Sequence, residues 1–244
     1  MKATIDIEAD TNVVENNIET HQLSLKDKIY KFVKWFPWFL FTWTIVLVYV
    51  FENLDDNKYS YGCHDGMFNW KLMTYHMFHN NIEHIVNNMI AFWLFGLYVH
   101  CTYNDFLNMI VYMVGAIASG CSYYIKCYID ESYADMIGAS GSIYAIMGVG
   151  FVIAIYRLVS CLHELGEGHD IKEKVAHIVK HYFSIINILC VLPMVSYDVV
   201  MFCTKEDNNT AHIGHLGGYI SGVLCGLLVV VYKAYIKSAN KDER

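Results

Sequence analysis

The stretch "MIGASGSIYAIMGVGFVIAIY", residues 136–156, places a serine between two glycines at the head of a long apolar run. A helix of about 20 residues, rising ~1.5 Å per residue, crosses the ~30 Å hydrocarbon core of a bilayer. The run is therefore long and apolar enough to be a transmembrane helix. Ser140 and Ser142 raise the question of whether these hydroxyls only allow close helix packing or whether one of them is a nucleophile.

Similar apolar runs account for most of the chain. Of its 244 residues, 55% are hydrophobic and only 17% are charged, whereas soluble domains carry about 25% charged residues. Six runs are near the spanning length, at about residues 35–51, 84–99, 106–125, 136–157, 182–202 and 211–235. The second run opens with polar residues and is expected to begin a few residues earlier. The sequence therefore predicts an all-α membrane protein with six transmembrane helices.

The basic residues indicate the orientation of this bundle. If the N-terminus is cytoplasmic, the outer loops hold only four of them, Lys58, Lys71, Lys126 and Lys205. This positive-inside bias predicts that both termini are cytoplasmic. The expected organisation is a polar, largely flexible cytoplasmic tail, a six-helix domain and a short basic cytoplasmic tail, over residues 1–34, 35–235 and 236–244.

The N-terminal segment resembles neither a secretory signal nor a mitochondrial presequence. It lacks an apolar core, and it carries acids such as Asp6, Glu8 and Asp10, which basic presequences avoid. We expect a multi-pass protein of the plasma membrane or a secretory-pathway membrane, or of the bacterial inner membrane if the source is prokaryotic, and a mitochondrial location is disfavoured. The net charge of −7 is spread over the tail and loops, and we expect no nucleic-acid partner.

Strongly polar side chains stand at the heads of three predicted spans. They belong to the segments "HNNIEHIVNN", "GASG" and "AHIGHLGGYISG", at residues 79–88, 138–141 and 211–222. With the N-terminus inside, these three spans all run from outside to inside, so each polar group lies within about 10 Å of the outer end of its helix. Such side chains are costly in a membrane and mark functional sites. The sequence predicts that they converge at one depth.

These side chains have the chemistry of acyl transfer. Ser140 needs a base to accept its proton, and the neutral imidazole of His215 suits this role near neutral pH. The tetrahedral intermediate then needs hydrogen-bond donors for its oxyanion. His84 and Asn88, four residues apart on one helix face, are the candidate donors together with the Ser140 N–H.

Small residues are expected to allow the close approach of two helices. Glycines recur every four residues down the last span, at Gly214, Gly218, Gly222 and Gly226. The fourth span has a similar small face, formed by Gly141, Ala145 and Gly148. Two such faces can pack tightly enough for His215 to reach Ser140, although glycine stripes are also common in ordinary packed spans.

These motifs resemble those of the rhomboid intramembrane proteases. "GASGSIYAIMG" resembles the GxSG motif around the family's serine, "HNNIEHIVNN" resembles its HxxxxHxxxN motif, and "GHLGGYISGVLCG" is similar to its histidine-bearing sixth helix. The order of the motifs and the helices that carry them agree, and the resemblance covers roughly residues 35–235. It implies a six-helix rhomboid-like bundle.

The resemblance also implies roles for individual residues. Ser140 is the nucleophile and His215 the general base of a dyad without an acid, and His84 and Asn88 serve the oxyanion. Tyr144 matches a tyrosine that stacks on the catalytic histidine, and His79 matches a structural histidine. Supporting positions in the motif and the stripe are Gly138, Gly141 and Gly218. The family's Trp-Arg loop motif appears here as Trp70–Lys71, and lysine lacks the bidentate fork of arginine.

Other interpretations of single residues remain open. His212 is a second candidate base, three residues from His215. Ser142 points roughly 200° away from Ser140 on a helix and is expected to pack. Asp198, near the outer end of the fifth span, is either the third member of a triad or, as we favour, an interfacial acid that snorkels to the outer surface.

The predicted function is that of an intramembrane serine endopeptidase acting on single-pass or other membrane proteins in the lipid bilayer. We expect no cofactor and no metal, since no HExxH motif occurs and a metal would leave the GASG serine unexplained. The main alternative is a catalytically inactive rhomboid-like protein that binds membrane clients and steers their trafficking or degradation. A transporter is disfavoured because matching halves with broken helices are absent from the sequence.

Overall fold

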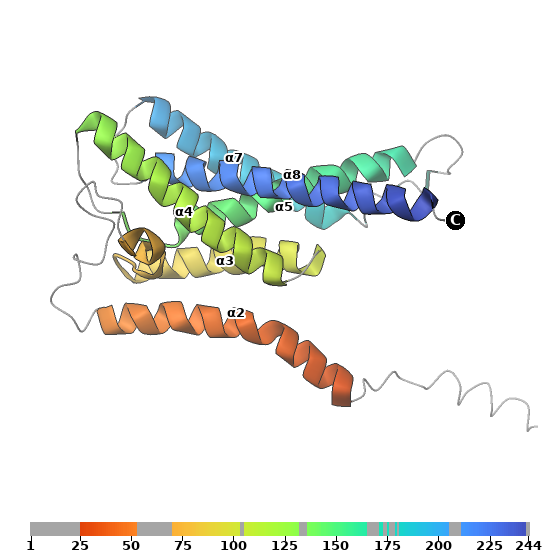
Figure 1. Cartoon of the computed structure of the whole chain (residues 1–244), viewed down its shortest axis with the longest axis horizontal. Coiled ribbons are helices and arrows are strands. Elements are labelled where there is room, and N and C mark those ends of the chain that lie inside the picture. Colours follow the sequence, from red (N-terminus) through yellow and green to blue (C-terminus); the bar gives the residue numbers. More distant parts are fainter. Residues whose placement is uncertain are drawn as a thin grey trace, which may run out of the picture. The chain divides into compact units, whose positions relative to one another are not determined.

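The computed structural model describes residues 25–52, 70–102, 105–131, 136–164, 171–172, 175, 179, 181–204 and 211–242. The chain divides into two compact units, Met1–Phe41 and Thr42–Arg244, and the second carries the candidate site. The main helices are α2 (Leu25–Glu52), α3 (Ile82–Thr102), α4 (Asp105–Asp130), α5 (Ser140–Glu164), α7 (Tyr182–Thr204) and α8 (His212–Asp242) (Figure 1). Two short 3₁₀ helices, η2 (Trp70–Met73) and η3 (Tyr75–Met77), precede α3.

Five of these helices are long and apolar enough to cross a membrane, namely α3, α4, α5, α7 and α8. Helix α2 has a shorter apolar segment, Trp38–Glu52, and it begins at Leu25, within the segment expected to be a flexible tail. Residues 1–24 of that tail lie outside the described residues. Helix α3 begins at Ile82, so the expectation of an earlier start for this span is confirmed. An all-α membrane protein, as predicted, is what the described residues form.

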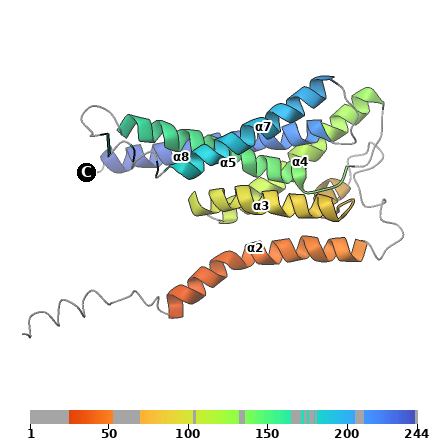
Figure 2. The ribbon, with the colours of Figure 1, turned by 180° about the vertical axis from the view of Figure 1, so that it is seen from behind.

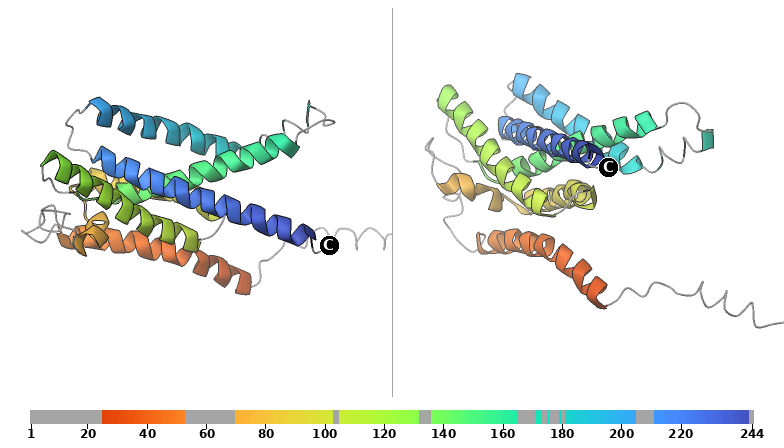
Figure 3. Two further views of the ribbon diagram at one scale, coloured as in Figure 1. Left: turned by 45° about the horizontal axis from the view of Figure 1, so that its top comes forward. Right: turned by 45° about the vertical axis from the view of Figure 1, so that its right-hand side comes forward.

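Helix α5 is the centre of the second unit. It packs against α3, α4, α7 and α8 (Figures 2 and 3). Half of its most apolar segment is buried, a larger share than in the other four helices that are long enough to span a membrane. Ile143, Ala145, Ile146 and Met147 are at most 2% exposed, as expected for a helix that is apolar all round.

The outer faces of the surrounding helices expose large apolar side chains. Leu189 and Val200 on α7 and Leu228 and Val231 on α8 are each more than half exposed. In water, so extensive an apolar surface would drive association. These faces are compatible with contact to lipid.

The segment formed by η2 and η3 contacts the centre of the second unit. Leu72 is buried, and a Cβ on Gly120 of α4 would collide with it. The Tyr75 hydroxyl donates to the Ala116 carbonyl in α4 at 2.8 Å. The Tyr75 carbonyl in turn accepts from the Gly138 N–H at 3.1 Å. This segment therefore links α4 to the loop that leads into α5.

Candidate active site

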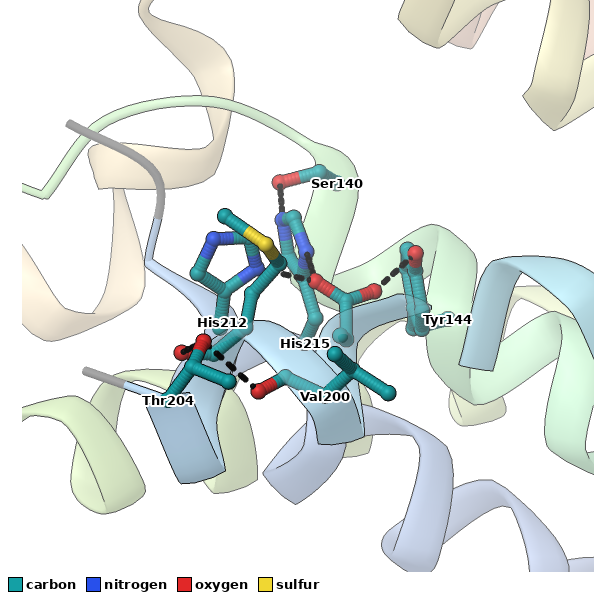
Figure 4. A network of polar contacts seen from close by, with 8 residues as sticks. Ser140, Tyr144, Val200, Thr204, His212 and His215 are labelled. Atoms are coloured by element: carbon teal, nitrogen blue, oxygen red, sulfur yellow. Dashed lines mark hydrogen bonds and ion pairs between the residues drawn. The ribbon is translucent and has the colours of Figure 1, made fainter. Parts of the chain in front are cut away.

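Ser140 and His215 face each other across the contact between α5 and α8. Ser140 is the first residue of α5, and His215 lies in the first turn of α8. The Ser140 Oγ is 2.8 Å from the His215 Nε2 (Figure 4), which is hydrogen-bond distance. The structure therefore brings together the two residues that the sequence nominated as nucleophile and base.

Glycines on α8 make this approach possible. A Cβ added to Gly218, one turn after His215, would fall on the carbonyl oxygen of Gly141, and a Cβ on Gly222 would fall on that of Ala145. Both obstacles are backbone atoms of α5, which cannot rotate away. The glycine stripe is thus the surface on which α5 and α8 meet.

The carboxylate of Asp198 lies behind the His215 ring, seen from Ser140. Asp198 belongs to α7 and is only 1% exposed. Its Oδ1 is 3.0 Å from the His215 Nδ1 and 2.5 Å from the His212 Nδ1. The favoured expectation of a snorkelling interfacial acid is therefore wrong, because the side chain turns inward to the two imidazoles.

His212, the second candidate base, is not the histidine that contacts Ser140. Its Nδ1 points to Asp198, while the ring nitrogen within hydrogen-bond distance of the Ser140 Oγ belongs to His215 (Figure 4). The two imidazoles are perpendicular, with centroids 6.2 Å apart. Ser142, two residues from Ser140, is fully buried, as expected for a packing residue.

Tyr144, one turn after Ser140, covers one face of the His215 ring. The two rings are stacked, with centroids 4.5 Å apart and planes 11° from parallel. The Tyr144 hydroxyl donates to the Oδ2 of Asp198. Its ring and its hydroxyl thus restrain the histidine and the carboxylate together.

His84 and Asn88 line the loop just before the serine. A Cβ on Gly138 would lie 2.6 Å from the His84 Cε1 and 3.6 Å from the Asn88 Nδ2. Gly138 has φ +114°, a conformation that side-chain-bearing residues rarely adopt, so glycine is required here for both space and backbone geometry. The Asn88 Nδ2 is buried and makes no hydrogen bond to the described part of the chain. A buried amide donor without a partner is costly and is available to a ligand beside Ser140.

The position of His84 is set by the start of α3. Asn81 precedes this helix, and its Oδ1 accepts the His84 N–H at 2.8 Å, which satisfies one of the free donors of the first turn. The helical spacing then places Asn88 one turn further on the same face.

His79 also supports the serine loop, next to His84, with the two ring centroids 5.1 Å apart. It is fully buried, and its Nε2 accepts the N–H of Ala139, the residue before Ser140, at 3.4 Å. Burial, reinforced by the neighbouring His84, lowers the pKa of His79 to about 3. The ring is therefore neutral and able to accept this bond.

His76, to which the sequence assigned no role, is buried in η3. Its Nε2 lies 2.9 Å from the Met73 carbonyl, which only accepts, and its Nδ1 lies 3.1 Å from the Tyr112 hydroxyl. Burial lowers the pKa of His76 to about 4, against the opposing effect of the Met73 bond. For Asp198, the alternative that the sequence favoured less, contact with a histidine, is what the structure shows. Its place inside an apolar run, about two turns before the end of α7 at Thr204, was a signal for it.

The only group of three potential metal ligands among the described residues is Asp198, His212 and His215. Their donor atoms lie within 4.8 Å of one another. Hydrogen bonds join both histidines to Asp198.

The fold and this site define the class of the protein, a polytopic helical membrane protein with a serine–histidine pair at the helix heads. A model of the rhomboid domain matches residues 69–232, and the chain belongs to the rhomboid family. It is similar to Rhomboid-related protein 2 of the mouse, with 22% identity over 181 residues, which is 72% of this chain and 52% of the mouse protein. The chain thus spans about half the length of this curated relative.

Proposed function

We propose that this protein is an intramembrane serine endopeptidase that hydrolyses peptide bonds in or near the transmembrane segments of other membrane proteins. The observation that carries the proposal is the 2.8 Å separation of the Ser140 Oγ and the His215 Nε2. A serine hydroxyl is a weak nucleophile unless a base accepts its proton. Such a base stands at this distance here.

The reaction follows from this pair. The Ser140 oxygen attacks the scissile carbonyl carbon while its proton passes to the His215 Nε2. Collapse of the tetrahedral intermediate breaks the C–N bond, and His215 returns the proton to the leaving amine. A water molecule then attacks the acyl-enzyme ester with His215 again as base, which releases the acid and restores Ser140.

The oxyanion of the intermediate is stabilised by donors beside the serine. The Ser140 N–H is at the positive N-terminal end of α5, where backbone donors have no partner within the helix. The Asn88 amide is buried and unpaired among the described residues, and His84 lies next to it at Gly138. We assign the oxyanion to these three donors.

The substrate is a single-pass or other membrane protein. A transmembrane helix hydrogen-bonds its own carbonyls, so the cleaved segment must unwind locally to expose the scissile bond. We propose a preference for segments with helix-weakening residues and for a small residue before the cut. We also propose six spans, with α2 supplying the first, and both termini in the cytoplasm, which puts the site near the outer or lumenal face.

An inactive client-binding protein is the second candidate, because rhomboid family membership does not by itself specify catalysis. The close pairing of the serine with a histidine favours the protease. A client-binding surface would not need an imidazole at hydrogen-bond distance from a hydroxyl.

Labelling of the purified full-length protein with a fluorophosphonate tests the proposal. Wild type is expected to be labelled, and both Ser140→Ala and His215→Ala are expected to abolish labelling and cleavage of a transmembrane reporter. Ser142→Ala, which removes a buried hydroxyl two residues away, is the matched control and is expected to remain labelled. A folded wild-type protein that does not react would refute the protease and favour the client-binding candidate.

A further inference from the structure

The carboxylate of Asp198 is the meeting point of three side chains. Its Oδ1 lies within hydrogen-bond distance of His212 and His215, and its Oδ2 accepts the hydroxyl of Tyr144. We propose that Asp198 is a positioning residue that holds His215 in the tautomer and orientation needed to accept the Ser140 proton. The proposal rests on the protease function proposed above and replaces a two-residue mechanism with a chain of three.

The hydrogen bonds define the tautomer of His215. An ionised carboxylate can only accept, so the Nδ1 of His215, 3.0 Å from the Asp198 Oδ1, carries the hydrogen. In the neutral ring the Nε2 is then bare, and this is the atom 2.8 Å from the Ser140 Oγ. Without the carboxylate, the opposite tautomer would present an N–H to the serine and could not accept its proton.

The surroundings of Asp198 support its ionised form. A buried carboxylate is costly unless it is hydrogen-bonded, and Asp198 is 1% exposed. The two imidazole donors and the Tyr144 hydroxyl satisfy both of its oxygens. The His212 bond on Oδ1 and the Tyr144 bond on Oδ2 fix the plane of the carboxylate, so that it keeps facing His215.

The negative charge also acts during the reaction. When His215 accepts the serine proton, it becomes an imidazolium whose Nδ1 is 3.0 Å from a carboxylate oxygen. That charge stabilises the imidazolium in a region of low dielectric. The ring is thereby held by two helices besides its own, by Tyr144 of α5 through stacking and by Asp198 of α7 through its Nδ1.

A purely structural role for Asp198, which would only fasten α7 to α8, makes different predictions. It would change thermal stability, and the KM of a substrate if the helices shifted, but it would leave the reactivity of the serine in the folded protein intact. A positioning role lowers kcat and the rate of fluorophosphonate labelling, with KM and the unfolding midpoint preserved.

The test compares Asp198→Asn with wild type in the full-length protein. Asparagine keeps the shape but offers an amide, so kcat and the labelling rate are expected to fall on the order of 10⁴-fold, as when the acid of a Ser-His-Asp triad is amidated. Asp130→Asn is the matched control, since Asp130 pairs with Lys126 at 2.8 Å at the exposed end of α4, and it is expected to behave as wild type. Nitrogen-15 spectra of histidine-labelled protein, with His215→Gln to identify the signal, are expected to show hydrogen on Nδ1 of His215 in wild type and on Nε2 in Asp198→Asn.

The outcomes separate this proposal from the protease function itself. A wild type that is not labelled refutes the protease function. A wild type that is labelled, beside a folded Asp198→Asn that is labelled at the same rate, refutes only the role of Asp198. If Asp198→Asn does not fold, the wild-type spectrum decides, because hydrogen on Nε2 of His215 would overturn the proposal and hydrogen on Nδ1 would support it.

Discussion

The packing of α5 against α8 predicts that one added methyl group disables the site. In Gly218→Ala the new Cβ would overlap the carbonyl oxygen of Gly141, the residue after Ser140. This oxygen belongs to the backbone of α5 and would lie 2.0 Å from the new Cβ. Relief therefore requires the two helices to separate by about 1.4 Å, which restores an ordinary van der Waals contact of about 3.4 Å. Gly218 is one turn along α8 from His215, so the separation is transmitted to the pair formed by Ser140 and His215.

The expected loss follows from that displacement. The distance from the Ser140 Oγ to the His215 Nε2, now 2.8 Å, would grow to roughly 4.2 Å, which is outside hydrogen-bond range. A misplacement of about 1 Å costs on the order of 10²-fold in rate, and overpacking costs about 1–3 kcal/mol in the free energy of unfolding. We therefore expect Gly218→Ala to insert and fold, with a lower unfolding midpoint and a kcat reduced about 100-fold.

The assay is cleavage of a transmembrane reporter by purified enzyme in liposomes, with thermal unfolding measured in parallel. Gly150→Ala, a glycine-to-alanine change on the facing helix α5, is the control. Its Cβ would lie 3.2 Å from the Nδ2 of Asn187, the end of a side chain rather than backbone, so kcat is expected to stay close to wild type. A folded Gly218→Ala enzyme with wild-type kcat would refute the argument that close helix contact sets the geometry of the pair.

Two further substitutions probe the surroundings of the pair. Asn88→Ala removes a buried donor beside Gly138 and is expected to lower kcat about 10–1000-fold. The control is Asn87→Ala on the exposed face, which is expected to leave kcat unchanged. Equal rates for wild type and Asn88→Ala would remove Asn88 from the proposed oxyanion site. For His76, burial holds the native pKa at about 4, below the ordinary 6.5, so the unfolded chain takes up a proton as the pH falls below 6.5 and the native chain does not. About 3 kcal/mol of unfolding free energy should be lost between pH 6.5 and 4 through this one group. His76→Gln should flatten the fall of the unfolding midpoint over that range, and parallel curves for the two proteins would contradict the assignment.

The residues of the candidate site could be predicted from the sequence because helix length and residue spacing indicate where they lie. The apolar runs predict the spanning helices, and alternate spans are expected to begin on the same side of the membrane, so the heads of three of them are expected at one depth. On that basis the sequence predicts four residues of the site, Ser140, His84, Asn88 and His215. The structure brings Ser140 to His215, and His84 and Asn88 to the adjacent Gly138.

The chain by itself therefore determined which helices form and which polar residues stand at their heads, because spacing and apolarity are local properties. The tertiary structure alone decided how each helix is rotated about its axis, and that rotation separates a lipid-facing acid from a buried one. Asp198 has apolar neighbours in sequence in either case. Its inward position depends on α7 packing against α5 and α8, where hydrogen bonds with Tyr144, His212 and His215 compensate for burying its charge.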